Sequence, residues 1–297
     1  MSGPFFGGDA MKRFIVILGA LGASLSPVFR RLSTAPTMVL VLYRVGFAAL
    51  LMTPYVLVKQ REALGKLRRR ELLLCAWSGV FLGFHFLCYF ESLRYTSIVV
   101  AEVLVNTEVL FVTLGSILFF RKRLTGKGWL AILIAFGGSV IVSMADLAGG
   151  GALKGNLLAL LGAVFGAGYT LVGTVCRRNG ITTALYTYIL YFSAAATVLL
   201  ITLASGLPPV GYEPLNLWTT LGMAVCCTLL GHSLYSWGLK FLPTSFVSMS
   251  KLMEPVFAAV WGLVLFREQP GILVLVGGAV VILGIALFSK VEEKEDA

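Results

Sequence analysis

Ten long apolar runs, separated by short polar or charged segments, constrain this chain more than any other feature of its sequence. A run of about 20 apolar residues is long enough to cross the hydrocarbon core of a bilayer as an α-helix. The runs also lack the strict alternation of apolar and polar residues that is typical of membrane β-strands. We therefore predict an all-α integral membrane protein with ten transmembrane helices, near residues 14–32, 37–58, 71–94, 97–120, 127–145, 155–176, 182–204, 215–239, 244–266 and 271–289.

Composition supports the membrane assignment. The 297 residues are 58% hydrophobic and only 13% charged, with a mean hydropathy of +0.90, whereas soluble domains carry about 25% charged residues. The net charge of +10 is compatible with nucleic-acid binding, but the basic residues lie in short loops between apolar runs, where they determine topology. We therefore expect the lipid bilayer as a partner and no nucleic acid. The five cysteines lie inside apolar segments without the spacing of a disulfide framework or zinc site.

The distribution of Lys and Arg predicts the orientation. Assigned to alternate sides, the loops and tails carry 17 basic residues on one side and five on the other, and two more lie within spans. Cytoplasmic loops are enriched in Lys and Arg. We therefore expect cytoplasmic tails at residues 1–12 and 290–297, in a multi-pass protein of the cell (cytoplasmic) membrane.

The two halves of the chain are related by a repeat with an offset of 146 residues. The segment that begins YFESLRYTS at Tyr89 aligns without gaps on YSWGLKFLPTS at Tyr235, which places Glu108 on Glu254 and Gly138 on Gly284. The repeats, at residues 13–146 and 154–289, hold five spans each. An odd number of spans inverts the second half in the membrane. Inverted-topology repeats are characteristic of secondary transporters, whose substrate site lies near the bilayer midplane at the repeat interface.

Two motifs resemble a known family. EPVFAAVWGLVLFREQPGILVLVGGAVVILGIAL resembles the end of the EamA domain of the drug/metabolite transporter superfamily, and LYRVGFAALLM resembles its second helix, with Arg44 at the family's usual arginine. The resemblance covers nearly the whole chain as two EamA units. It implies a secondary transporter, often an exporter, of amino acids, related metabolites or other small solutes. The chain departs from the pattern at Val109, at the basic residues 121–123 and at Lys251.

Charged residues inside spans are the main candidates for the site. They are costly at the bilayer centre and usually face the bundle interior or an aqueous cavity. Glu102 and Asn106 share a helix face at i,i+4 spacing, whereas Lys251 and Glu254 are i,i+3 neighbours, which suggests mutual neutralisation. That pair either only fixes packing or lines the cavity and meets a zwitterionic or charged solute. Glu108 could be a neutral acid, a proton carrier in a proton-coupled cycle, or a partner of Lys251 across the interface.

Other polar residues complete the candidate site. Arg44 binds an anionic group of the substrate, or else it snorkels or pairs with a glutamate to hold the bundle. Pro255, inside the ninth span, predicts a kink or hinge beside a cavity, or has a purely architectural role. The full set of candidate substrate-binding residues is Arg44, His85, Tyr89, Glu102, Asn106, Glu108, Tyr169, His232, Tyr235, Trp237, Lys251 and Glu254. We expect no metal and no cofactor.

Two other function classes remain as alternatives. An intramembrane enzyme would need a catalytic motif, but the chain has no HExxH, GxSxG or P-loop pattern. A membrane scaffold would need an extramembrane interaction surface, for which the short loops leave little room. We therefore predict a transporter, not an enzyme. The residues leave the substrate, the direction of transport, the coupling ion and the oligomeric state open.

Overall fold

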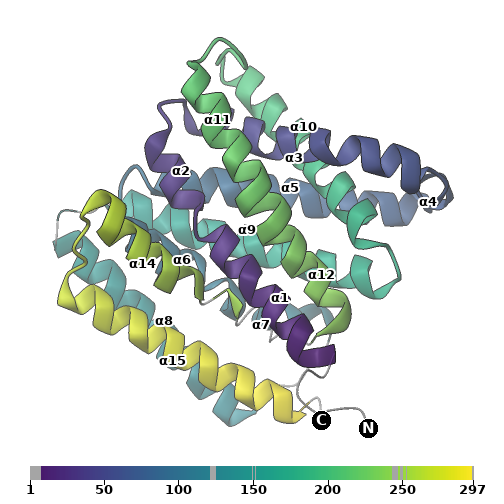
Figure 1. Cartoon of the computed structure of the whole chain (residues 1–297). Helices are drawn as coiled ribbons and strands as arrows, with labels where there is room; N and C mark the ends of the chain where they lie inside the picture. Colours follow the sequence, from purple (N-terminus) through teal and green to yellow (C-terminus); the bar gives the residue numbers. More distant parts are fainter. Residues whose placement is uncertain are drawn as a thin grey trace, which may run out of the picture.

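The structure, a computed structural model, describes residues 8–120, 125–148, 150, 152–242, 247, 250–251 and 253–295. All of its regular elements are helices (Figure 1). They are α1 (Gly8–Ala23), α2 (Ser26–Leu32), α3 (Thr37–Lys59), α4 (Arg61–Lys66), α5 (Arg69–Ser92), α6 (Ile98–Val105), α7 (Glu108–Phe120), α8 (Gly126–Ala148), α9 (Leu153–Arg178), α10 (Thr183–Ala204), α11 (Pro214–Gly222), η1 (Met223–His232), α12 (Ser233–Phe241), α14 (Met253–Phe266) and α15 (Ile272–Glu295).

Seven helical segments in the described part of the chain are long and apolar enough to cross a membrane. They are Met11–Leu32, Thr37–Lys59, Arg69–Ser92, Ile98–Phe119, Leu153–Arg178, Thr183–Ala204 and Pro214–Phe241. Three shorter apolar helices accompany them, at Gly126–Val142, Val256–Phe266 and Ile272–Gly284. Large apolar side chains cover the outside of the bundle, and Leu118 and Ile272 are each 73% exposed. Such a surface suits lipid, and the chain is an all-helical multi-pass membrane protein.

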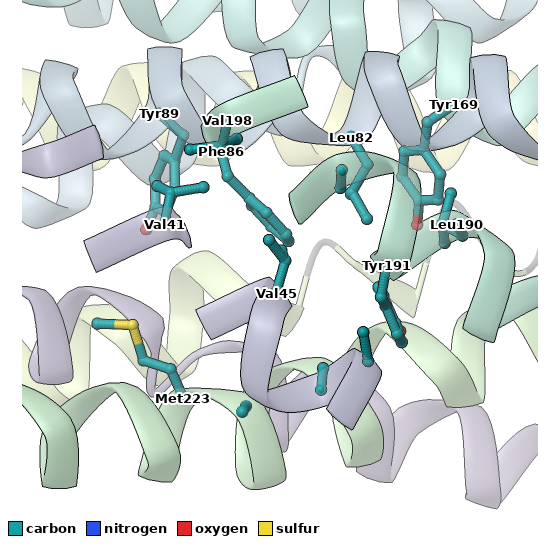
Figure 2. Close-up of a cluster of buried hydrophobic side chains, with 14 of the residues drawn as sticks. Val41, Val45, Leu82, Phe86, Tyr89, Tyr169, Leu190, Tyr191, Val198 and Met223 are labelled. Carbon is teal, nitrogen blue, oxygen red and sulfur yellow. The ribbon is translucent and has the colours of Figure 1, made fainter. Parts of the chain in front are cut away.

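The main apolar core lies between α3, α5 and α10. Figure 2 shows Phe86 of α5 directed toward Val45 of α3, with Leu190 and Val198 of α10 in the same cluster. These side chains are at most 1% exposed, so the three helices are held by close packing. Helices α8 and α15 lie side by side along another edge of the molecule (Figure 1), with a separate apolar cluster against α6.

The contact between α8 and α15 depends on two glycines that the repeat matches. A Cβ on Gly138 would lie 2.7 Å from the backbone nitrogen of Val281, and a Cβ on Gly284 would lie 2.8 Å from the Cα of Ala135. The two contacts exchange when the 146-residue offset is applied, because Gly138 becomes Gly284 and Ala135 becomes Val281. Close helix approach of this kind requires the small residue.

The fourth predicted span is present as Ile98–Phe119, but a two-residue turn at 106–107 interrupts its helix. We expected a continuous helix over residues 97–120, but α6 ends at Val105 and α7 begins at Glu108. The intervening side chains bond to backbone carbonyl groups: Asn106 Nδ2 donates to the Glu102 oxygen at 2.9 Å and Thr107 Oγ1 to the Leu104 oxygen at 2.6 Å. Side chains of these types compete with helical hydrogen bonding. The break places Glu108 at the start of a helix.

The ninth predicted span contains a turn at Lys251. Within the expected helix 244–266, Val247 and Ser250 are helical, Lys251 lies in a turn, and α14 begins at Met253. Pro255 therefore falls in the first turn of α14, where its missing N–H removes no helical hydrogen bond. Residues 243–246, 248–249 and 252 lie outside the described part of the chain. The start of α14 corresponds to the α6–α7 break under the 146-residue offset.

The eighth predicted span contains a π-helix. Within the expected helix 215–239, the segment η1 joins α11 to α12. Thr228 Oγ1 donates to the Met223 oxygen at 3.2 Å, and the Thr228 oxygen accepts the Tyr191 hydroxyl at 3.1 Å. A wide helical turn of this kind is frequent at functional sites. It ends at His232, one of the candidate site residues.

The ends of the chain are more helical than a description as tails implies. Within the expected tail 1–12, Gly8 to Lys12 already belong to α1, and α15 continues to Glu295, beyond the predicted end of the last span at 289. In Figure 1 the start of α1 and the end of α15 lie toward the same side of the molecule.

Candidate substrate cavity

A buried cavity lies at the centre of the molecule, beside the α6–α7 break and the start of α14. Its walls come from α1, α2, α3, α5, α6, α7, η1, α14, the α6–α7 break and the turn before α14. Nine of the twelve candidate residues line it: Arg44, His85, Tyr89, Glu102, Asn106, Glu108, His232, Lys251 and Glu254. Its free volume of about 30 Å³ leaves room for only a few water molecules.

Lys251 and Glu108 form a buried ion pair across the two halves of the chain. Their side chains are each 6% exposed, and Lys251 Nζ lies 2.6 Å from Glu108 Oε1. The Thr170 hydroxyl donates to the same carboxylate oxygen at 2.7 Å. The Lys251 ammonium also lies over the rings of Tyr169 and Tyr235, at 5.2 and 5.5 Å from their centroids. This pair is the cross-interface alternative that the sequence left open for Glu108.

The predicted neutralisation of Lys251 by Glu254 is therefore wrong in this structure. Lys251 lies in a turn and not on the helix that carries Glu254, so the i,i+3 geometry of a continuous helix is absent. Glu254 instead accepts the Tyr235 hydroxyl at 2.6 Å. Glu108 and Glu254, which the repeat matches, do line the same cavity.

The matched tyrosines, Tyr89 and Tyr235, each donate to a carboxylate, but not to matched ones. Tyr89 donates to Glu102, whereas exact repeat symmetry would give it Glu108. Asn106 Nδ2 approaches the second oxygen of Glu102 at 3.3 Å. Lys251 explains the asymmetry because its repeat equivalent is Val105, which carries no charge. The two repeats thus contribute matched tyrosines and glutamates to the cavity region, but only the second repeat contributes a lysine.

Arg44 is fully buried and only partly satisfied. Its Nε donates to Thr228 Oγ1 at 2.8 Å, and its guanidinium carbon lies 3.9 Å from the ring centroid of Phe86. Both terminal nitrogens, Nη1 and Nη2, lack a hydrogen-bond partner among the described residues. A buried arginine in this state is costly unless acceptors in the adjoining cavity satisfy the two donors.

The two histidines converge from α5 and the end of η1. Their ring centroids are 6.3 Å apart. His85 Nδ1 bonds to the Gly162 oxygen at 2.9 Å, and His232 Nδ1 lies 3.5 Å from the Tyr169 hydroxyl. Tyr169 and Tyr235 therefore contact the cavity residues although they do not line the cavity itself.

Trp237 does not belong to this site. It packs on Phe241, with ring centroids 5.0 Å apart, in the cluster between α1 and α12. Two residues along an α-helix turn the side chain to a different face, so Tyr235 and Trp237 do not point the same way. Sequence reasoning also missed Ser26, which lines the cavity, and Thr170 and Thr228, which contact its charged groups. Thr170 follows the candidate residue Tyr169, but a single hydroxyl residue in an apolar helix does not by itself predict a site.

Comparison with known proteins identifies the family. The family model described as "EamA-like transporter family" matches residues 11–144 and again residues 153–290. The chain belongs to the EamA-like transporter family. Its two halves are two EamA-like units, and the resemblance seen in the sequence is thereby confirmed.

Named relatives of the chain are transporters. The pseudopaline exporter CntI of Pseudomonas aeruginosa is 24% identical over 88% of this chain and 89% of its own length. The uncharacterized transporter YxxF of Bacillus subtilis is 25% identical over 92% of this chain and 86% of its own length. A crystal structure of another protein covers 97% of this chain with a TM-score of 0.67 and 17% identity, so the two share a fold.

Proposed function

We propose that this chain is a secondary transporter that exports small organic metabolites, such as amino acids, across the cytoplasmic membrane by alternating access. The observation that carries the proposal is the buried cavity with opposite charges at matched breaks in the two EamA-like units. Intramembrane charges that face a cavity mark substrate or ion pathways. The breaks before Glu108 and at Lys251 correspond to the discontinuous helices that form transporter sites.

The proposed substrate site consists of the nine lining residues together with Tyr169 and Tyr235. Its charged groups suit a solute with both a cationic and an anionic group. Glu102 and Glu254 are the proposed proton carriers of a proton-coupled cycle, because each bonds to a tyrosine hydroxyl and Glu108 is occupied by Lys251. Lys251 would then release Glu108 or the solute as the site opens.

Alternating access requires the cavity to open, because its present volume excludes an organic solute. One end of the bundle is closed by contacts between the halves: Arg31 pairs with Glu268 at 3.0 Å, and Glu268 accepts the Ile98 N–H at 3.2 Å. We propose that these contacts break when that end opens and that Pro255 serves as a hinge at the start of α14. By the predicted orientation this end faces outside.

We further propose ten spans in two inverted five-helix units, with the three shorter apolar helices completing the seven long ones. The reciprocal contacts of Gly138 and Gly284 support this arrangement, because they exchange under the repeat offset. A two-fold axis between α8 and α15 would generate both. An even number of spans also places both termini on one side.

A transport assay tests the function. Purified protein in liposomes should move one or more radiolabelled amino acids or related metabolites, and an imposed pH gradient should change the rate if protons are coupled. Lys66→Gln, at a side chain that is 80% exposed, provides the control variant. Turnover of a compound without movement across the membrane would favour the enzyme alternative. Absence of both transport and turnover would favour the scaffold alternative.

Reporter fusions test the orientation. A phosphatase fused near Gly211 should be active, because that loop is predicted outside, and one fused near Arg68 should be inactive. The positive-inside count is the physical reason, since basic loops are retained in the cytoplasm. The reverse pattern would contradict the proposed topology while leaving the cavity unaffected.

A further inference from the structure

The loop that joins α3 to α5 carries a group of exposed basic side chains. It contains the short helix α4, which lies at the edge of the molecule in Figure 1. Residues 59–71 include six basic residues and two acidic ones. Five of the basic side chains form no ion pair with a carboxylate of the described residues, and we call them the α4 basic cluster: Lys59, Arg61, Arg68, Arg69 and Arg70.

The other ends of α3 and α5 treat their basic residues differently. Arg31, shortly before α3, pairs with Glu268 at 3.0 Å. Arg94, just after α5, pairs with Glu91 at 3.0 Å. The chain thus supplies counter-charges at one end of these helices and leaves the α4 basic cluster without them. Repulsion among five like charges is relieved by an anionic partner from outside the chain.

The cluster is held in place by the apolar side of the same loop. Ala63, Leu64 and Leu67 pack against the main apolar core. The Thr182 hydroxyl, in the turn between α9 and α10, donates to Gln60 Oε1 at 3.1 Å. The loop is therefore anchored to the bundle while its basic side chains are exposed, so little backbone order has to be gained when a partner binds.

The cluster adjoins the surface that faces lipid. Leu57 and Val58 precede it on α3, Leu72 and Leu73 follow it on α5, and all four are exposed apolar side chains. They lie within about one helical turn of a basic residue of the cluster. The basic side chains therefore lie at the level where the hydrocarbon of a bilayer gives way to the headgroups.

We propose that the α4 basic cluster binds the phosphate groups of anionic phospholipids in the adjoining leaflet. The paired N–H donors of arginine match phosphate oxygens, and basic segments next to a membrane helix are attracted to anionic lipids. By the predicted orientation this leaflet is the cytoplasmic one. The lipid would brace the ends of α3 and α5, which carry Arg44 and His85 to the central cavity. This inference does not depend on the proposed transport function.

Lipid binding is measured on the purified protein in a neutral detergent. Phosphatidylglycerol should raise the melting temperature, and native mass spectrometry should show bound lipid. Phosphatidylcholine, which has no net charge, and inorganic phosphate, which lacks the acyl chains, should have little effect. High salt should weaken the effect of phosphatidylglycerol, because ions screen exposed charges.

Variants locate the site. Arg68→Gln, Arg69→Gln and Arg70→Gln together should raise the half-saturating concentration of phosphatidylglycerol about a hundredfold, since each basic residue near an anionic surface contributes about fivefold in affinity. Without lipid the melting temperature should stay near that of wild type, because these side chains are exposed and no ion pair is lost. Lys59→Gln with Arg61→Gln provides a second variant, expected to weaken binding about twentyfold.

A matched control removes the same charge elsewhere. Lys127→Gln, Lys240→Gln and Lys290→Gln together neutralise three exposed lysines that are predicted to be cytoplasmic but lie outside the α4 loop. This variant should bind phosphatidylglycerol like wild type. A phosphatase fusion near Gly211 shows whether each variant keeps its orientation, which separates lipid binding from the effect of basic residues on topology.

Three outcomes would overturn the inference. Equal stabilisation of wild type by phosphatidylcholine and phosphatidylglycerol would show that the headgroup charge is not recognised. An equal loss of binding in the control variant would show that net charge and not the α4 basic cluster is responsible. Inorganic phosphate that stabilises as well as the lipid would indicate a site for a soluble anion. None of these results would bear on solute transport, which is measured separately.

Discussion

Replacing Lys251 by methionine is expected to lower the free energy of unfolding by about 3–5 kcal/mol, the usual cost of breaking a buried ion pair. The Glu108 carboxylate, 6% exposed, would remain without its cationic partner. Transport should also be lost. Denaturant unfolding of the purified protein and the yield of monodisperse protein measure the first effect, and the liposome assay measures the second. Lys66→Gln, at an exposed side chain, should leave both unchanged.

The identity of the partner is tested by rescue. Lys251→Met combined with Glu108→Gln should recover most of the lost stability, because no uncompensated charge remains. Lys251→Met combined with Glu254→Gln should not, since Glu254 bonds to Tyr235 and not to Lys251. If Glu254→Gln rescued the stability of Lys251→Met and Glu108→Gln did not, Glu254 would be the partner of Lys251, as the sequence suggested. Wild-type transport in the rescued variant would mean that the pair serves the fold and not the solute.

Leucine at Gly138 or at Gly284 is expected to cost about 3 kcal/mol or more, the upper end for overpacked sites, because each added side chain would meet backbone atoms of the facing helix. The two variants should be affected alike, since their contacts exchange under the repeat offset. Melting temperature and the fraction of monodisperse protein in detergent provide the measurement.

Gly137 provides the matched control for this pair of substitutions. It neighbours Gly138 on α8, and a Cβ there would meet nothing within 4 Å. Gly137→Leu should therefore be tolerated on the exposed side of the helix. Equal melting temperatures for Gly137→Leu and Gly138→Leu would show that α8 and α15 do not pack as closely as the structure has them.

The helical membrane class and the family could be read from the sequence. The length and apolarity of the runs decide the class, because only a helix satisfies its own backbone hydrogen bonds in lipid, whereas two sequence motifs carry the family resemblance. Nine of the twelve candidate residues line one cavity, since a charged side chain in an apolar run has few acceptable locations other than a cavity. Their role in substrate binding stays a prediction. Trp237 lies outside the cavity lining because an aromatic residue is equally at home in packing, and Thr170 and Thr228 gave no charge signal.

The breaks in the spans could not be predicted with the same rules. Apolar continuity predicts one helix over residues 97–120, yet Asn106 and Thr107 bond to backbone carbonyl groups and end α6. The π-helix η1 has no signature in the apolar pattern either. In both places side-chain hydrogen bonds to backbone carbonyl groups compete with the helical hydrogen bonds. In η1 a tertiary contact is also present, because the Tyr191 hydroxyl donates to the Thr228 backbone oxygen.

The sequence by itself placed two matched glutamates, Glu108 and Glu254, inside apolar runs of the two EamA-like units, because hydrophobicity and the 146-residue offset are properties of the residues alone. Only the tertiary structure decided which charges meet. Lys251 pairs with Glu108, 143 residues away, and not with its neighbour Glu254, because the turn before α14 directs it across the interface between the halves. Arg44 keeps two donors without a partner among the described residues for the same reason: the packing of α3 against η1 and α5 brings it Thr228 and Phe86 but, in the part of the chain that the structure describes, no carboxylate.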